Sequence, residues 1–118
     1  AWFKQNAAGR AHTVGRKKPN QFGLYDMHGN VCEWCNDWYT DEYPDELVID
    51  PRGPKGGTAR VLRGGGWDNI AAWCESAWRN AVEPETRGDA LGFRVALGPT
   101  EPVFVPEEDD GVLTFTSY

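Results

Sequence analysis

The chain of 118 residues has little of what several protein classes require: three cysteines, two histidines and no long apolar run. No stretch approaches the roughly 20 apolar residues of a membrane-spanning helix, so we expect a soluble protein without a membrane partner. The 12 basic against 18 acidic residues give a net charge of −6. The one small basic run, Arg16-Lys17-Lys18, is too short for the basic stripe of a nucleic-acid-binding protein, so we expect no nucleic-acid partner.

The scarcity of cysteine and histidine also limits metal and redox chemistry. Cys32 and Cys35 form a C-x-x-C pattern, but a zinc site needs a second pair or additional histidines, and only His12 and His28 exist. A thioredoxin-like motif requires a βαβ context, which the sequence does not indicate. The pattern therefore favours packing, or a disulfide with Cys74, over metal or redox chemistry.

An initiator methionine and a signal peptide are also missing, because the chain starts at Ala1-Trp2-Phe3. We therefore expect a window of a longer protein, whose compartment the sequence does not indicate. The domain is expected to occupy residues 1–98. Residues 99–110 contain three prolines and five acids, which is typical of a linker, and residues 111–118 begin a further segment or tail.

What the chain does contain is six tryptophans and 14 glycines, which indicates one small loop-rich domain with a core of large rings. We expect that core to include Tyr25, Trp34, Trp38 and Phe93.

The distribution of apolar residues predicts only short elements. Residues 22–26 and 31–38 are expected to be extended segments around a turn at 28–30. Residues 60–62 and 93–97 have the composition of buried strands, and 71–82 predicts a turn of helix followed by a strand. The glycines at 64–66 predict close backbone approach or a bulge, and we expect Arg63, Arg79 and Arg94 to pair with acids such as Asp37 or Glu33.

Three separated blocks resemble one known family, and they occur in that family's order. They are PNQFGLYDMHGNVCEWCNDWY at 19–39, RVLRGGGW at 60–67 and LGFRVAL at 91–97. They are similar to the blocks P-N-x-x-G-L-Y-D-M-x-G-N-V-W-E-W-x-x-D-W-Y, R-V-x-R-G-G-S-W and G-F-R of the formylglycine-generating-enzyme, or sulfatase-modifying-factor, family. The resemblance covers residues 2–97 and only the C-terminal half of the family domain. It implies a loop-rich α+β fold, a variant of the C-type lectin fold.

The resemblance also implies a calcium site in the first block. Residues matching Asp26 and Glu33 bind the ion by side chain in the family, and residues matching Gly29 and Val31 bind it by backbone carbonyl. Calcium prefers such oxygen ligands, and all four positions are suitably occupied. A plain turn with two solvated acids is the alternative.

The catalytic positions of the copper-dependent oxidase are less well matched. The family's two thiolates, five residues apart, fall on Asn69 and Cys74, and an amide is a poor ligand for a soft ion. The family's serine is Gly66 here, and the first Trp of its W-E-W is Cys32. We therefore expect no copper, and Cys74 remains the only catalytic candidate. It is expected to be structural, with a disulfide to Cys35 preferred over one to Cys32.

The stretch from 67 to 80 is instead expected to be a binding surface. Its candidate ligand-binding residues are Trp67, Asp68, Asn69, Trp73, Glu75, Trp78 and Arg79. At least one of the three tryptophans should then be exposed. The leading hypothesis is a calcium-stabilised domain that binds a small ligand or a protein partner without enzyme activity. Two alternatives stay open: a metal-dependent oxidoreductase whose ligands lie partly outside this chain, and a variable display protein of a diversity-generating retroelement.

Overall fold

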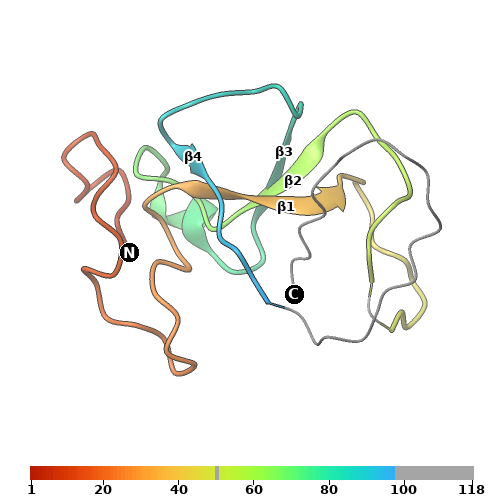
Figure 1. Cartoon of the computed structure of the whole chain (residues 1–118), viewed down its shortest axis with the longest axis horizontal. Coiled ribbons are helices and arrows are strands. Elements are labelled where there is room, and N and C mark those ends of the chain that lie inside the picture. The colour runs from red at the N-terminus through yellow and green to blue at the C-terminus, as the bar shows by residue number, and fades with distance from the viewer. Residues whose placement is uncertain (50, 98–118) are drawn as a thin grey trace.

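A computed structural model describes residues 1–49 and 51–97 of the chain (Figure 1). The expected linker and tail at 99–118 lie outside the described residues. The described part contains four strands and one short 3-10 helix, with long loops between them. Loop therefore dominates, as the glycine content predicts, but the only helix among the described residues has four residues.

The four strands form one mixed sheet with the order β3-β2-β1-β4. Strand β1 (Cys32–Trp38) lies antiparallel to β2 (Arg60–Arg63), which in turn lies antiparallel to β3 (Arg79–Val82). The last strand, β4 (Leu91–Gly92), joins the other edge of β1 in parallel. Because β4 comes from the end of the described chain, it places the family's closing G-F-R block beside the start of β1.

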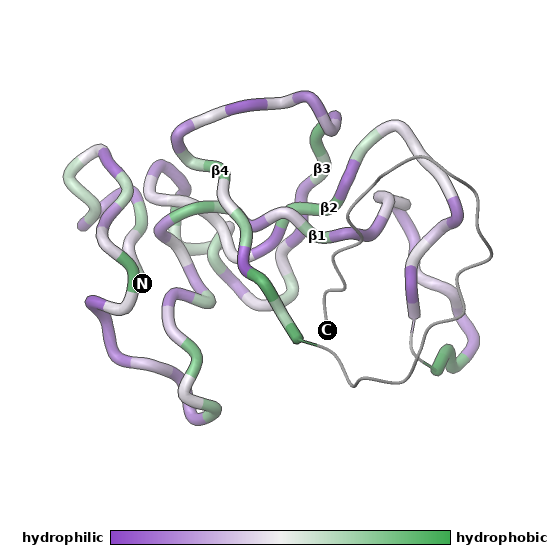
Figure 2. Tube along the Cα trace, in the orientation of Figure 1, coloured by the Kyte–Doolittle hydropathy of each residue, from purple (hydrophilic) through white to green (hydrophobic). Residues whose placement is uncertain are grey.

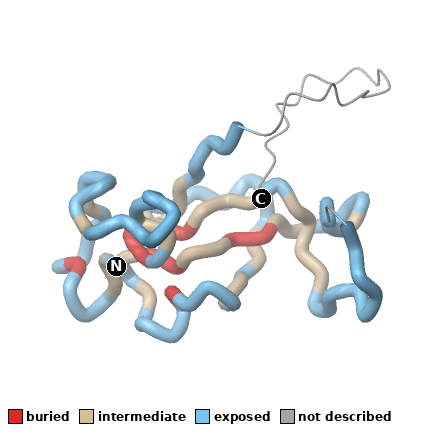
Figure 3. Tube along the Cα trace, turned by 90° about the horizontal axis from the view of Figure 1, so that it is seen from below, coloured by how far each residue is buried: buried red, intermediate tan, exposed pale blue. Residues whose placement is uncertain are grey.

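The buried core is small and lies where β1 and β2 meet the loops that flank them (Figure 3). Its fully or nearly buried members are Ala7, Cys32, Val61, Leu62 and Cys74. Two of the five are thiols, which behave as small apolar groups in such surroundings. The large aromatic rings expected here lie further out: Tyr25 is 44% exposed and Phe93 68% exposed, while Trp34 and Trp38 are half-buried.

The structure confirms most of the predicted elements and corrects two. Strands β1, β2 and β3 and the 3-10 helix η1 (Ala71–Cys74) lie where the apolar pattern predicts them. Residues 22–26 form turn and coil rather than a strand. The segment 93–97 is not the buried strand that its composition predicts, because the pairing with β1 ends at Gly92 and the next residues form an exposed, largely apolar arm (Figure 2).

The long N-terminal loop is held to the sheet by Asn30. Its backbone N–H donates to Trp2 O at 2.7 Å, and its carbonyl accepts from Trp67 N at 2.8 Å. Its side chain accepts from His12 N at 2.8 Å and donates to His12 O at 3.1 Å. Trp2 stacks on His12 with ring centroids 3.8 Å apart, and Lys17 Nζ lies 3.9 Å from the Trp2 ring. Asn30 thus connects three segments distant in sequence, the one at His12 by its side chain and those at Trp2 and Trp67 by its backbone.

Candidate functional site

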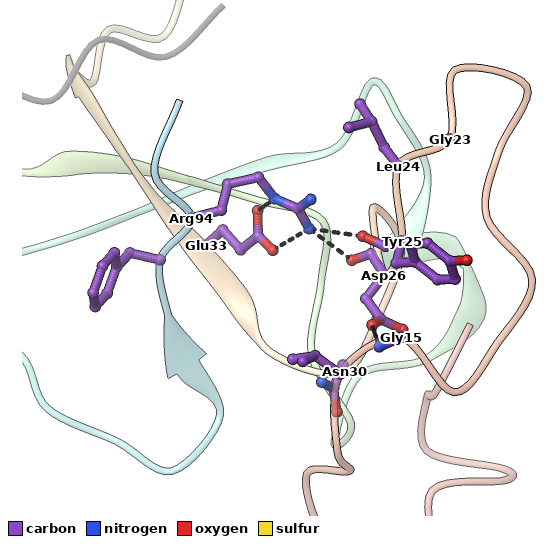
Figure 4. A pocket seen from close by; sticks show the side chains of 11 residues that line it. Gly15, Gly23, Leu24, Tyr25, Asp26, Asn30, Glu33 and Arg94 are labelled. Carbon is purple, nitrogen blue, oxygen red and sulfur yellow. Dashed lines mark hydrogen bonds and ion pairs between the residues drawn. The ribbon is translucent and has the colours of Figure 1, made fainter. Parts of the chain in front are cut away.

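A pocket of about 380 Å³ lies between the turn at 23–30, strand β1 and the arm after β4 (Figure 4). Glu33 projects into it from β1 and forms an ion pair with Arg94 of the arm. Arg94 Nε lies 2.5 Å from Glu33 Oε2, and Nη2 lies 2.5 Å from Oε1. This two-point contact raises the pKa of Arg94 above its usual value, so the guanidinium stays charged. The prediction that Arg94 pairs with an acid is confirmed.

The opposite wall of the pocket is a turn with left-handed backbone at several residues. Asp26 has φ +53° although it has a side chain, and Gly29 and Asn30 also have positive φ. Asp26 Oδ2 accepts from Gly15 N at 2.7 Å, whereas Oδ1 is buried and has no hydrogen-bond partner. A buried oxygen without a donor is costly unless something absent from the protein chain binds it.

Three of the four predicted calcium ligands line this one pocket: Asp26, Gly29 and Glu33. Val31 is not among the lining residues. No three His, Cys, Asp or Glu side chains form a metal-binding group in the described residues, and the predicted set uses only two carboxylates. The unpartnered Asp26 oxygen, in a pocket with a second carboxylate, fits a hard cation. Calcium itself stays a prediction.

The candidate catalytic cysteine lies beneath the glycine run that follows β2. A Cβ atom at Gly65 would lie 2.5 Å from Trp73 O and 2.7 Å from Cys74 Sγ. Gly65 also has φ +69°, so both space and conformation require glycine there. The predicted close backbone approach is confirmed. Cys74 is 6% exposed, and burial is the first cause that raises the pKa of its thiol.

Asn69 occupies the place of the family's first thiolate and is held by several hydrogen bonds. Its Oδ1 accepts from Gly66 N at 3.0 Å and from Cys32 Sγ at 3.5 Å, and its Nδ2 donates to Asp68 Oδ1 at 3.2 Å. A side chain at position 66 would begin 3.0 Å from that same Asp68 oxygen. The three residues that depart from the enzyme pattern, Cys32, Gly66 and Asn69, therefore form one hydrogen-bonded group.

Cys32, Cys74 and Asp68 lie in one cluster, in which the two cysteines are buried. Cys32 and Cys74 are buried thiols, and the proximity of Asp68 and of Cys74 adds to burial in raising the pKa of Cys32 to about 11. Cys32 is therefore close enough to Cys74 for their charges to interact, whereas the expectation placed it apart. The Cys35–Cys74 bridge stays a prediction, and the structure adds the interaction between Cys32 and Cys74.

The expected binding surface is partly exposed. Trp73 is 48% exposed and stacks on Trp78, with ring centroids 6.2 Å apart. The expectation that one of the three tryptophans is exposed is met by Trp73, while Trp67 and Trp78 are half-buried. Asp68 and Glu75 are exposed, and Asn69 faces the cysteines. The surface is therefore centred on the two stacked rings rather than on the whole predicted set.

Two arginines beside this surface do not pair with acids as predicted. Arg79 lies over the rings of Tyr39 and Tyr43, at 4.7 and 4.4 Å, and donates to Asp41 O at 2.8 Å. Arg63 donates to the carbonyls of residues 76–78 and to Tyr43 Oη. Both guanidinium groups fix loop backbone through these carbonyl contacts.

Sequence reasoning missed two residues of these sites. His28 Nδ1 lies 2.6 Å from Cys74 O and connects the turn to the cysteine loop. Asn30 holds the N-terminal loop, and its signal in the sequence is the Gly29-Asn30 pair, since asparagine tolerates positive φ and has an amide for backbone bonds.

The family model described as the sulfatase-modifying factor enzyme 1-like domain matches residues 1–98. The chain belongs to this family. It is 42% identical over 83 residues to the formylglycine-generating enzyme of Streptomyces coelicolor, covering 67% of this chain and 26% of that one. It is 41% identical over 87 residues to the serine/threonine-protein kinase pkn1 of Chlamydia pneumoniae, covering 71% of this chain and 14% of that one.

A solved structure supports the assignment of the fold to this family. The Treponema denticola variable protein 1 is 43% identical, with a TM-score of 0.74 over 78% of this chain and 34% of that chain. The chain thus spans about a third or less of these relatives. No helix in the described part of the chain has the length and apolar character that a membrane span requires.

Proposed function

We propose that this domain is a ligand- or protein-binding module of the family, with the lectin-like variant of the fold, and that it does not oxidise cysteine to formylglycine. One observation carries the proposal: Asn69, in place of the first thiolate, uses its amide to bind Gly66 N and Cys32. The one family cysteine that is present, Cys74, is buried with a raised thiol pKa, whereas a nucleophile or soft-metal ligand needs a thiolate.

Calcium is proposed as the structural ion of the pocket at Glu33. The side chains of Asp26 and Glu33 and the carbonyls of Gly29 and Val31 would hold it. When bound, the ion supplies positive charge that connects the turn to β1. The unpartnered Asp26 Oδ1 supports this assignment.

The lack of oxidase activity is tested with copper-loaded protein and a peptide that carries the sulfatase cysteine motif, using the full-length parent where the chain is part of one. We expect no aldehyde product. Asn69→Cys alone should not restore activity, because Gly66 and Cys32 also depart from the enzyme pattern. Aldehyde formation by the unmodified protein would establish the oxidoreductase alternative.

The binding surface is tested by selecting ligands from a displayed peptide library on the unmodified protein. Selected peptides should lose at least about tenfold in affinity on Trp73→Ala, because an exposed ring is a typical anchor of recognition. Val14→Ala is the matched control, because Val14 is exposed on the N-terminal loop, outside this surface. Equal binding by both variants contradicts the assignment of the surface.

A variable display protein is the second candidate. The likeness to a structure named as a variable protein favours it. A neighbouring reverse-transcriptase gene with a repeat of the 67–87 coding segment is the expected genomic sign.

A further inference from the structure

Arg94 contacts four oxygen atoms of the types that also bind metal ions. Its guanidinium contacts both carboxylate oxygens of Glu33 at 2.5 Å. Its Nη2 also lies 3.0 Å from Tyr25 O and 3.4 Å from Asp26 O. Two carboxylate oxygens and two carbonyl oxygens, one pair from each wall of the pocket, therefore face one positive charge (Figure 4). A hard divalent cation prefers the same oxygen types.

We propose that Arg94 is a built-in competitor for the cation site at Glu33 and thereby sets the affinity of that site. The inference rests on the proposed calcium site and adds the residue that controls it. The guanidinium takes one hydrogen bond to each Glu33 oxygen from the side of the pocket, so a metal ion that approaches from that side competes with Arg94 for the same carboxylate. Repulsion between a divalent ion and a guanidinium at contact distance strengthens this competition.

The surroundings of Arg94 allow it to leave. Its side chain is 36% exposed, against 20% for Glu33. It belongs to the arm at 93–97, beyond the last sheet pair at Gly92, where Phe93 is 68% and Val95 73% exposed. Asp26 Oδ1 stays without a partner while Arg94 holds Glu33. The turn therefore keeps one buried carboxylate oxygen that Arg94 does not contact and that a cation would bind. Displacement of Arg94 would move the arm and leave the sheet pairing in place.

The exchange is controlled by metal concentration and not by the titration of Arg94. The ion pair with Glu33 raises the pKa of Arg94, an arginine that is charged at all physiological pH values in any case. Glu33 would exchange one cationic partner for another, so its charge is compensated in both states.

The test is isothermal titration of the full chain with calcium chloride, comparing the unmodified protein with Arg94→Gln and Arg87→Gln. Arg87 is exposed between β3 and β4, so its variant has the same change of net charge without the ion pair. We expect Arg94→Gln to bind calcium about tenfold more tightly and Arg87→Gln to stay within about twofold. Arg94→Lys, which keeps the charge but not the two-point contact, should lie between them and covers the case in which the glutamine variant does not fold.

A second readout is the Arg94 Nε–H signal in nitrogen-15 NMR spectra. We expect its protection from solvent exchange to be lost as calcium saturates the protein. Unchanged or weaker calcium binding by Arg94→Gln and Arg94→Lys would overturn the proposal and leave Arg94 as a structural ion pair. Binding by the variants but not by the unmodified protein would support it. If no form binds calcium, the proposed calcium site fails, and this inference fails with it.

Discussion

At the scale of single residues, Gly29 is the position least able to accept a side chain. It has φ +75°, and a Cβ atom would lie 2.1 Å from Trp2 O. Gly9 has φ +71° and open space within 4 Å of the place a Cβ atom would take, so it is the matched control for strain alone. We expect Gly9→Ala to cost about 1–2 kcal/mol and Gly29→Ala roughly 3–5 kcal/mol, the sum of strain and overpacking. Urea unfolding of both variants measures this, and equal losses would contradict the close contact with Trp2.

Cys32 gives a pH dependence of stability with a definite sign. Burial, Asp68 and Cys74 raise its thiol pKa to about 11 from the ordinary 9.0 of an unfolded chain. The neutral thiol is favoured by folding, so its contribution is fully present below pH 9 and is lost as pH rises through 11. The free energy of unfolding should therefore fall less steeply between about pH 8 and 11 in Cys32→Ser than in the unmodified protein. Parallel curves would mean that Cys32 ionises as freely in the folded state as in the unfolded one.

At the scale of elements, the connection of the N-terminal loop to the sheet depends on the Asn30 amide. Asn30→Asp keeps the shape and the tolerance of φ +71°, but it removes the donor to His12 O and adds a negative charge close to that carbonyl. We expect a loss of roughly 1–3 kcal/mol in the free energy of unfolding. Trypsin should also cut faster at Arg10 and Arg16, which limited proteolysis measures. Asn36→Asp, on an exposed position of β1, is the control and should leave the cleavage rate unchanged.

Elements with their own apolar pattern can be predicted from the sequence, and those defined by distant partners cannot. Strand β2 has two adjacent buried residues, Val61 and Leu62, whose run predicts it directly. Strand β4 has two residues, and it exists because Leu91 and Gly92 pair with Cys32 and Glu33, which lie far earlier in the chain. Residues 93–97 have a stronger strand composition than β4 but lie outside the sheet, since composition does not specify a partner.

At the scale of the whole molecule, calcium is expected to stabilise the fold by mass action. An ion that binds only the folded chain adds about 2.7 kcal/mol at roughly one hundred times its dissociation constant. The melting temperature should rise with added calcium and fall with chelator in the unmodified protein. It should respond to neither in Glu33→Ala. If chelator leaves the melting temperature unchanged, the site binds no calcium and is only a turn closed by Arg94.

The two sites differ in how far sequence alone can predict them. The family blocks predict that Asp26 and Glu33 lie near one another, and charge predicts that Arg94 pairs with an acid. The role of Arg94 at the cation site requires coordinates, because the pairing of β4 with β1 is what brings the arm to the turn, where Arg94 contacts Tyr25 O. The proximity of Cys32 to Cys74 also requires them, since the C-x-x-C pattern does not say which of its two cysteines meets the loop that carries Cys74.

The parallel pairing of β4 with β1 sets an order on how the chain acquires its structure. Cys32 N donates to Ala90 O, so the first backbone bond of β1 on this edge waits for a residue synthesised much later. Contacts of such long range close large loops and slow folding. During synthesis β1, β2 and β3 can pair as soon as Val82 has emerged, whereas the edge beside Cys32 and Glu33 stays open until Leu91 follows. During that interval the nascent chain presents an unpaired strand edge. If the ribosome stalls or releases the chain at this stage, the open edge favours aggregation.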